Sequence, residues 1–243
     1  MPSSLPILII HTGNPDAEGL ARFGSYGEQL RRAAGLAPGA ARIVPVFQDA
    51  ALPPAHECAA ALVTGSPAMV TDREPWSEQA AAWLREAIAA GLPVFGVCYG
   101  HQLMAHALGG EVGDNPRGRE AGTQAVALSA DAQGDPLLAD APARFPAQMQ
   151  HTQSVLRPPP GARVLGASAL DGCQILRYGP AAVSVQFHPE FDDALTRDDL
   201  RRRGERYRRM GLDVDALAAS VQPSPYAATL ARRFLDLYAR VPA

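Results

Sequence analysis

The chain has 243 residues, of which 47% are hydrophobic and 19% charged, a composition typical of a globular protein with room for one good-sized domain. Its net charge of −3 lacks the basic excess that general nucleic-acid or membrane-surface binders need. All 22 basic residues are arginine. Without lysine the chain can form neither a Walker-type phosphate loop nor a Schiff base with a substrate.

The cysteines Cys58, Cys98 and Cys173 are widely spaced and form no Cys-x-x-Cys pair. This pattern fits a reducing cytoplasm and predicts neither a disulfide framework nor a zinc ribbon. No apolar run approaches the roughly 20 residues that cross a bilayer, and the amino terminus lacks the basic segment of a signal peptide. We therefore expect a cytoplasmic protein without nucleic-acid or membrane partners.

In the first half of the chain, short apolar runs alternate with segments of helical period, which predicts strand–helix–strand units with parallel pairing. The expected strands cover residues 5–11, 42–47, 59–63 and 93–97. The expected helices cover residues 27–34, 76–90 and 99–108. Pro75 and Gly91 mark the two ends of the second helix.

After residue 110 the pattern changes to strand-like runs separated by Gly, Pro and Asp turns. These runs cover residues 123–128, 144–150, 163–167, 173–178 and 182–187. We expect them to be antiparallel additions to the sheet, with the last returning to its centre. Helices are expected at 192–210, 214–220 and 226–240, and neither a repeat nor a flexible linker is evident. The prediction is one α/β domain over 1–243, with a core at about 5–191 and a helical extension at 192–243.

The sharpest chemical signal is the segment Gly-Val-Cys-Tyr-Gly-His-Gln, from Gly96 to Gln102. Cys98 stands between a buried strand and a helix, with a glycine two residues away on each side, as in the Gly-x-Ser-x-Gly nucleophile elbow. Such a turn lifts the side chain above the sheet, and the helix N-terminus favours a thiolate. Two alternatives remain open: a small buried cysteine, the state expected of Cys58 and Cys173, and a redox-sensing thiol.

Near the end of the last predicted strand the sequence reads Gln-Phe-His-Pro-Glu. His188 can hold and donate a proton for a thiolate nucleophile, and Glu190 can fix its tautomer and orientation. Pro189 stiffens the connection between them. Histidine, carboxylate and Cys98 all fall at C-terminal ends of strands, where open α/β sheets place their sites. Catalysis by these three residues is therefore predicted over a structural role for the histidine.

Together the two motifs resemble those of the class I glutamine amidotransferase family, and both are complete here. The resemblance covers residues 5 to about 191 and implies an open, mostly parallel, flavodoxin-like sheet with helices on both faces. Segments 64–67, 115–122 and 151–155 look like those of stand-alone members similar to the amidotransferase domain of GMP synthetase. Ser184 stands where many members carry glycine.

The resemblance also implies roles for further residues. Backbone N–H groups of Ser66 and Tyr99 would form an oxyanion hole, with Gly65 as an alternative donor. Four residues would contact the substrate: Gln102, Gln150, Thr152 and Gln153. No metal and no organic cofactor are expected.

Other polar groups are expected to be structural or solvated. His101 and His106 lie five residues apart on one predicted helix, away from metal-ligand spacing. Four aspartates form no EF-hand pattern and are expected to face solvent: Asp192, Asp193, Asp198 and Asp199. The arginine-rich run at 201–209 is expected to be a solvated helical face rather than a partner site.

The implied function is cleavage of the γ-carboxamide of glutamine through a Cys98 thioester. Fewer than about 60 residues of this sequence follow Glu190, too few for a synthetase domain, so the ammonia is expected to pass to a separate acceptor enzyme. A free-standing γ-glutamyl peptide or conjugate hydrolase is the first alternative. A non-catalytic regulatory amidotransferase-like module is the second. Self-association into a homo-oligomer is compatible with either.

Overall fold

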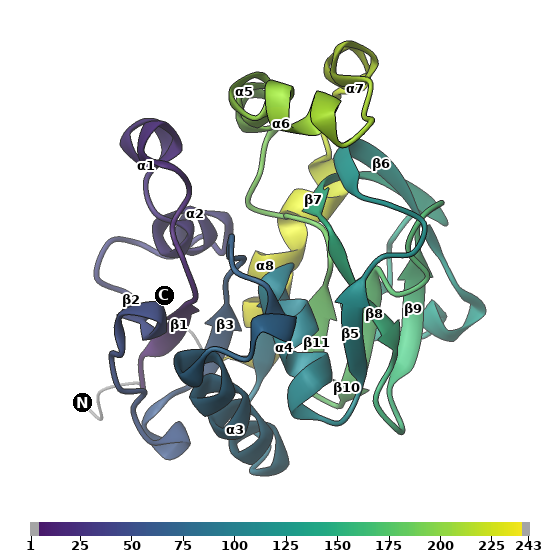
Figure 1. Ribbon diagram of the computed structural model, residues 1–243. Coiled ribbons are helices and arrows are strands. Elements are labelled where there is room, and N and C mark those ends of the chain that lie inside the picture. Colours follow the sequence, from purple (N-terminus) through teal and green to yellow (C-terminus); the bar gives the residue numbers. More distant parts are fainter. Residues whose placement is uncertain (1–4, 240–243) are drawn as a thin grey trace.

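The computed structural model describes residues 5–239, and a nine-stranded mixed sheet runs through them (Figure 1). The strand order is β2–β1–β3–β4–β11–β10–β9–β6–β7. The parallel half contains β1 (Ile7–His11), β2 (Ala41–Pro45), β3 (Ala60–Val63), β4 (Val94–Val97) and β11 (Ala182–Val185). The antiparallel half contains β6 (Glu120–Leu128), β7 (Arg144–His151), β9 (Arg163–Ala167) and β10 (Ile175–Gly179).

The predicted mostly parallel sheet with antiparallel additions is therefore confirmed. The last strand returns to the centre as expected, because β11 pairs in parallel with β4 and antiparallel with β10. This junction brings the chain after β11 next to the chain after β4, the two segments that carry the predicted catalytic residues.

Helices cover both faces of the parallel half. They are α2 (Tyr26–Ala33) and α8 (Pro225–Tyr238) on one face, and α3 (Pro75–Ala89) and α4 (Tyr99–Ala107) on the other. Ile9 of β1 packs in one core cluster with Leu30 of α2 and Phe234 of α8. Its neighbour Ile10 packs in a second cluster with Leu84 of α3. Because successive strand side chains point to opposite faces, a continuous apolar run marks a strand buried on both sides.

The helical extension begins with α5 (Asp193–Arg202), α6 (Gly204–Arg209) and α7 (Val214–Ser220). The predicted helix at 192–210 is thus two helices, which meet at Arg203. The extension packs on β6 through a small cluster that includes Leu200, Tyr207 and Val214. Figure 1 shows α5, α6 and α7 gathered at one end of the sheet, on the same side as α1 (Ala17–Phe23).

The helix α1 was not predicted, and neither was a two-stranded antiparallel sheet of β5 (Glu111–Asp114) and β8 (Gln153–Arg157). The remaining elements are short 3-10 turns at Val46–Gln48, Ala55–Glu57, Val70–Asp72, Ala130–Ala132 and Pro136–Leu138. Across residues 5–239, every helix is too short or too polar to cross a membrane.

Candidate active site

Cys98 occupies a strained turn between β4 and α4. Its φ is 52° and its ψ −102°, a positive φ that non-glycine residues rarely adopt and that clusters at functional sites. The two elbow glycines allow the tight packing around it. A Cβ added at Gly100 would lie 2.7 Å from the carbonyl oxygen of Val63, and one at Gly96 would lie 2.7 Å from the carbonyl oxygen of Gly100. Both contacts are closer than real side chains tolerate, so glycine is required at each position.

His188 lies beside Cys98 and is held by Glu190. Its Nδ1 lies 2.8 Å from Glu190 Oε1, and its ring stacks on Phe191 with centroids 4.1 Å apart. A Cβ added at Gly65 would lie 3.0 Å from His188 Cε1 and 3.6 Å from Cys98 Cβ, so both side chains border the same glycine. His188 Nε2 is buried and has no hydrogen-bond partner among residues 5–239. This nitrogen is therefore free to exchange a proton with the thiol or a substrate.

The electrostatic surroundings of His188 favour its charged form. Burial disfavours the imidazolium, but the carboxylate of Glu190 and the sulfur of Cys98 outweigh burial and raise the pKa of His188 to about 10. At neutral pH the ring therefore carries a proton that it can donate. A protonated imidazole next to a thiol is the arrangement that nucleophilic cysteines require.

A single pocket contains Cys98 and His188 in its lining and encloses about 580 Å³ of empty space, counting its open mouth. Five of the other predicted residues line it: Ser66, Tyr99, Gln102, Gln150 and Thr152. Three do not: Gly65 and Glu190 lie behind His188, and Gln153 points elsewhere. The Gln153 amide donates instead to Thr71 Oγ1, at 2.6 Å.

The loop at 64–68 is held from within the protein. Ser66 Oγ donates to the carbonyl oxygen of Thr12 at 2.7 Å and accepts from the Ala68 N–H at 3.1 Å. The carbonyl of Gly65 accepts from Thr12 Oγ1 at 2.9 Å. On the other side of Cys98, Tyr99 is the first residue of α4, so its N–H has no partner inside the helix.

The predicted substrate-binding glutamines have structural partners as well. The Gln102 amide donates to the carbonyl oxygen of Gln153 at 2.7 Å and to Gln186 Oε1 at 3.0 Å. These two hydrogen bonds join α4 to the start of β8 and to the residue after β11. The Cys98 thiol lies 3.9 Å from the carbonyl oxygen of Gln150. Main-chain groups at 150–152 therefore border the nucleophile, whereas the Gln102 side chain is fixed by its neighbours.

A family model matches most of this chain. The model described as "Glutamine amidotransferase class-I" matches residues 23–203, more than half of the chain. The chain belongs to the class I glutamine amidotransferase family, an amidohydrolase kind of enzyme.

The relatives of this amidotransferase include GMP synthase (glutamine-hydrolyzing) of Thermomicrobium roseum, 40% identical over 129 residues that are 53% of this chain and 23% of that protein. A protein named as one subunit of the GMP synthase (glutamine-hydrolyzing) of Ignicoccus hospitalis is 42% identical over 100 residues, 40% of this chain and 50% of that protein. The matched part thus spans at most half of the length of these two curated relatives.

Two solved structures share the amidotransferase fold. A glutamine amidotransferase of Thermotoga maritima has a TM-score of 0.75 at 19% identity, and the match covers 96% of each chain. One from Methylobacillus flagellatus also has a TM-score of 0.75, at 20% identity, covering 99% of this chain and 98% of the other.

Several residues that sequence reasoning missed also line the amidotransferase pocket. Arg119 precedes β6, and Arg203 and Arg206 come from the helical extension. Tyr26 and His151 border the pocket too. Arg119 lies in the segment at 115–122 that resembles stand-alone relatives, but that resemblance assigns it no role, and Arg203 and Arg206 lie beyond the His-Pro-Glu motif.

The expectation of a solvated face at 201–209 is wrong for part of that run. Arg203 lines the pocket, and Arg202 is buried with its side chain only 6% exposed. Asp198 and Asp199, expected to face solvent, are buried as well, at 7% and 6% exposure. These carboxylates can be buried because Asp198 pairs with Arg202 and Asp199 pairs with Arg203. Arg208, further along, is exposed as expected.

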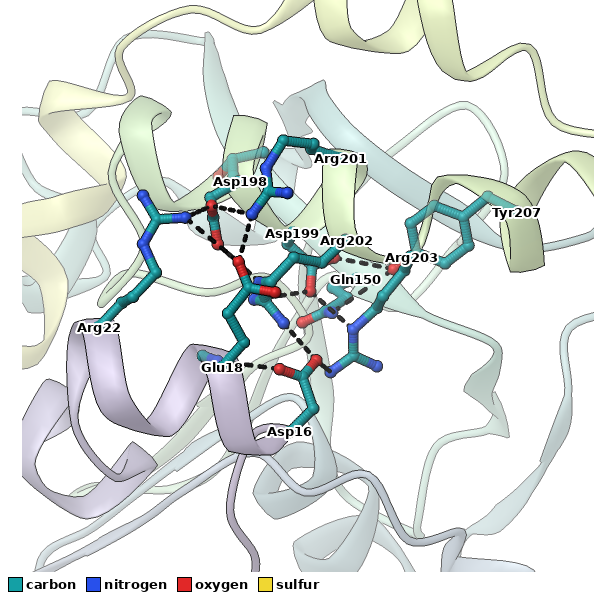
Figure 2. Close-up of polar contacts among 12 residues, drawn as sticks. Asp16, Glu18, Arg22, Gln150, Asp198, Asp199, Arg201, Arg202, Arg203 and Tyr207 are labelled. Atoms are coloured by element: carbon teal, nitrogen blue, oxygen red, sulfur yellow. Dashed lines mark hydrogen bonds and ion pairs between the residues drawn. The ribbon is translucent and has the colours of Figure 1, made fainter.

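A network of ion pairs joins α1 to the cap, our name for α5 and α6 (residues 193–209), as Figure 2 shows. Arg202 Nε lies 2.6 Å from Asp198 Oδ2, and the same guanidinium pairs with Asp16, which precedes α1. Asp198 also pairs with Arg22 of α1. Segments 176 residues apart in sequence are thereby held together at the rim of the pocket.

We expect Asp198→Ala to lower the free energy of unfolding by about 2–3 kcal/mol, because it leaves the buried Arg202 side chain without one of its two close counterions. Urea denaturation followed by circular dichroism measures the change. Asp215→Ala is the matched control: Asp215 pairs with Arg208 at 3.0 Å but is 87% exposed, so its loss should cost less than about 0.5 kcal/mol. Equal effects of the two substitutions would contradict a structural role for the network.

The two helix histidines make structural contacts outside the pocket lining. His101 is buried and its Nδ1 lies 2.7 Å from Ser184 Oγ. Burial lowers the pKa of His101 to about 4, so the ring is neutral at physiological pH. His106 Nε2 lies 3.0 Å from Glu78 Oε1.

One group among residues 5–239 brings three metal-ligating side chains within 4.8 Å of one another: Glu120, His151 and Asp171. These atoms are largely engaged with other side chains. Glu120 Oε2 lies 3.0 Å from His151 Nε2 and accepts from the Gln174 amide at 2.7 Å. These hydrogen bonds fix the ring of His151 beside the pocket, whereas Asp171 Oδ2 is buried without a hydrogen-bond partner among residues 5–239.

Proposed function

We propose that this amidotransferase hydrolyses the γ-carboxamide of glutamine through a covalent thioester on Cys98 and delivers the ammonia to a separate acceptor enzyme. The observation that carries the proposal is the buried His188–Glu190 pair beside a strained elbow cysteine. The pair supplies a proton donor with a fixed tautomer, and the elbow presents the nucleophile to the same pocket.

In the proposed reaction the Cys98 thiolate attacks the γ-carbon of the substrate amide. The carbonyl oxygen becomes an oxyanion and accepts hydrogen bonds from the N–H groups of Ser66 and Tyr99, with Gly65 as the alternative donor. Each such donor typically lowers the barrier by about 3 kcal/mol. His188 gives its proton to the nitrogen as the C–N bond breaks, and ammonia leaves.

The second half of the reaction releases glutamate. His188, now neutral, removes a proton from a water molecule that attacks the γ-glutamyl thioester. The C–S bond breaks, the thiolate of Cys98 returns, and His188 is again protonated. Glu190 keeps its hydrogen bond to Nδ1 throughout, so that Nε2 always faces the reacting atoms.

The acceptor is inferred from the relatives. The Ignicoccus hospitalis protein is named as one subunit of a GMP synthase, and the Thermomicrobium roseum protein as a glutamine-hydrolyzing GMP synthase. A synthetase that uses ammonia is therefore the partner we propose, with glutamine as the substrate. We place the reaction in the cytoplasm, where the thiol of a free cysteine stays reduced.

We also propose that the chain acts as one amidotransferase domain, with a core at about 5–191 and the helical extension built onto it. The extension contributes to the core: Phe234 of α8 packs against Phe95 of β4 with ring centroids 5.3 Å apart. Arg203 and Arg206 from the same extension line the pocket.

The second candidate is a free-standing γ-glutamyl peptide or conjugate hydrolase. Its support is the loop at 64–68, which Thr12 already holds in place without a partner. If only a partner protein could align this loop, glutamine turnover by the isolated chain would stay low. A loop that is already aligned in the isolated chain would not limit turnover in this way.

Steady-state ammonia and glutamate release by the purified chain separates the two functions. We expect slow turnover of free glutamine that rises when host extract containing the acceptor enzyme is added. Faster cleavage of a γ-glutamyl dipeptide than of glutamine, without extract, would instead identify the hydrolase. Vigorous turnover of free glutamine with no partner present would contradict both and indicate a simple glutaminase.

A further inference from the structure

The pocket that contains Cys98 is lined by basic groups and by no acidic ones. Among residues 5–239, its lining includes the guanidinium groups of Arg119, Arg203 and Arg206 but neither aspartate nor glutamate. A half-enclosed pocket with one sign of charge attracts ligands of the opposite sign. The three arginines differ, however, in whether a carboxylate already compensates their charge.

Arg203 is already paired. Its Nε lies 2.7 Å from Asp199 Oδ1, and its Nη2 lies 3.8 Å from Asp16 Oδ2. Arg206 is exposed on α6, where water screens its charge. Arg119 is half-buried, and no carboxylate of residues 5–239 lies within ion-pair distance of it.

Arg119 is also held in a fixed orientation. Its Nη1 donates to Thr152 Oγ1 at 2.5 Å, its Nη2 donates to the Tyr207 hydroxyl at 3.3 Å, and the guanidinium lies 4.7 Å from the Tyr207 ring centroid. The Tyr207 hydroxyl in turn donates to Asp199 Oδ2 at 2.9 Å, and the tyrosine is fully buried. Figure 2 shows Tyr207 beside Asp199 and Gln150.

The Arg119 guanidinium still has unused donors. It carries five N–H bonds, two of them engaged as described, and its Nε is buried without an acceptor among residues 5–239. A half-buried charge and a buried donor without an acceptor destabilise the folded protein unless a ligand compensates them. A carboxylate is the group that a guanidinium fork binds best, through two parallel hydrogen bonds.

We propose that Arg119 binds the α-carboxylate of the γ-glutamyl substrate. The inference rests on the proposed function, because glutamine and every γ-glutamyl conjugate carry that carboxylate the same number of bonds from the scissile amide. It makes Tyr207 of the cap a positioning residue, since the tyrosine orients Arg119. The helical extension is then part of substrate recognition.

Two thiol reagents test this assignment independently of turnover. One is 6-diazo-5-oxo-L-norleucine, a glutamine analogue with the α-carboxylate, and the other is iodoacetamide, which has none. We expect Arg119→Gln to slow modification of Cys98 by the glutamine analogue by roughly 10- to 100-fold, mainly through weaker binding, as expected for a lost charge-assisted pair. Modification by iodoacetamide should stay near the wild-type rate.

Arg117→Gln is the matched control, because Arg117 is exposed, lies two residues away and does not line the pocket. It should leave both rates unchanged, and Arg119→Lys should restore part of the loss. Equal slowing of both reagents by Arg119→Gln, or slowing of neither, would overturn the carboxylate assignment alone. Failure of both reagents to modify Cys98 in the wild-type chain would overturn the proposed function and this inference with it.

Discussion

Cys98→Ala is expected to lower kcat for γ-glutamyl amide cleavage by on the order of 10⁴-fold or more, the scale seen when a covalent nucleophile is removed. The substitution removes the sulfur that we propose forms the acyl intermediate, while the proposed oxyanion hole and the pocket remain. Ammonia release from glutamine, or from a γ-glutamyl dipeptide, measures the loss.

The matched control is Cys58→Ala, since Cys58 is also buried but lies outside the pocket. Burial raises the pKa of the Cys58 thiol, and it raises that of Cys173 to about 11, so neither ionises readily at neutral pH. Glutamine-like electrophiles should therefore modify Cys98 first. Full activity of Cys98→Ala, or preferential labelling of another cysteine, would refute its assignment as the nucleophile.

Glu190→Gln is expected to lower kcat by on the order of 10²- to 10⁴-fold, because the neutral amide no longer stabilises the charged ring of His188 or fixes its tautomer. Glu78→Gln is the control: Glu78 also contacts a histidine, His106, but on a part of the molecule away from the pocket. It should retain activity near the wild-type value. Comparable losses in both variants would show that the effect is structural.

The pH dependence of kcat/KM should change with Glu190 as well. In the wild-type chain the pKa of His188 is raised to about 10, so the form that can protonate the leaving ammonia persists until the pH approaches that value. In Glu190→Gln the largest raising influence is gone and burial still lowers the pKa. The alkaline limb should therefore move to lower pH. An unchanged alkaline limb would mean that this limb reports the titration of a group other than His188.

The sequence predicted the nucleophile elbow and the parallel half of the sheet because both depend on short, contiguous segments of the chain. A run such as Ile7–His11, buried at every position, can only be a strand with helices on both faces. The Gly96 and Gly100 spacing reflects close contacts with the backbone of Gly100 and of Val63, respectively, that no other residue would allow. His188 and Glu190 follow β11 directly, so their proximity to each other was also a local property.

The unpredicted elements depend on contacts between distant segments. The helix α1 has little apolar face, with Leu20 at 39% exposure, and is held by ion pairs of Glu18 and Arg22 with the cap. The pairing of β5 with β8 joins segments that lie on either side of β6 and β7. The ion pairs between α1 and the cap follow no periodic pattern in the sequence. For this reason the sequence indicates only a solvated face for the arginine-rich run at 201–209.

The same reasoning explains why Arg119 could not be recognised from the sequence. Its environment is assembled from Thr152, on the turn between β7 and β8, and from Tyr207, on α6. Only the folded chain brings these groups to the mouth of the Cys98 pocket. The substrate contact that we propose thus depends on long-range packing, whereas the proposed catalytic residues lie in short motifs.

The central claim is that Cys98 forms a γ-glutamyl thioester, and the most direct measurement is mass spectrometry of the protein quenched in acid during turnover of a γ-glutamyl substrate. We expect a mass gain of one γ-glutamyl group on the peptide that contains Cys98, absent from Cys98→Ala and discharged by neutral hydroxylamine. Turnover without any such adduct, or an adduct on Cys58 or Cys173, would contradict the account.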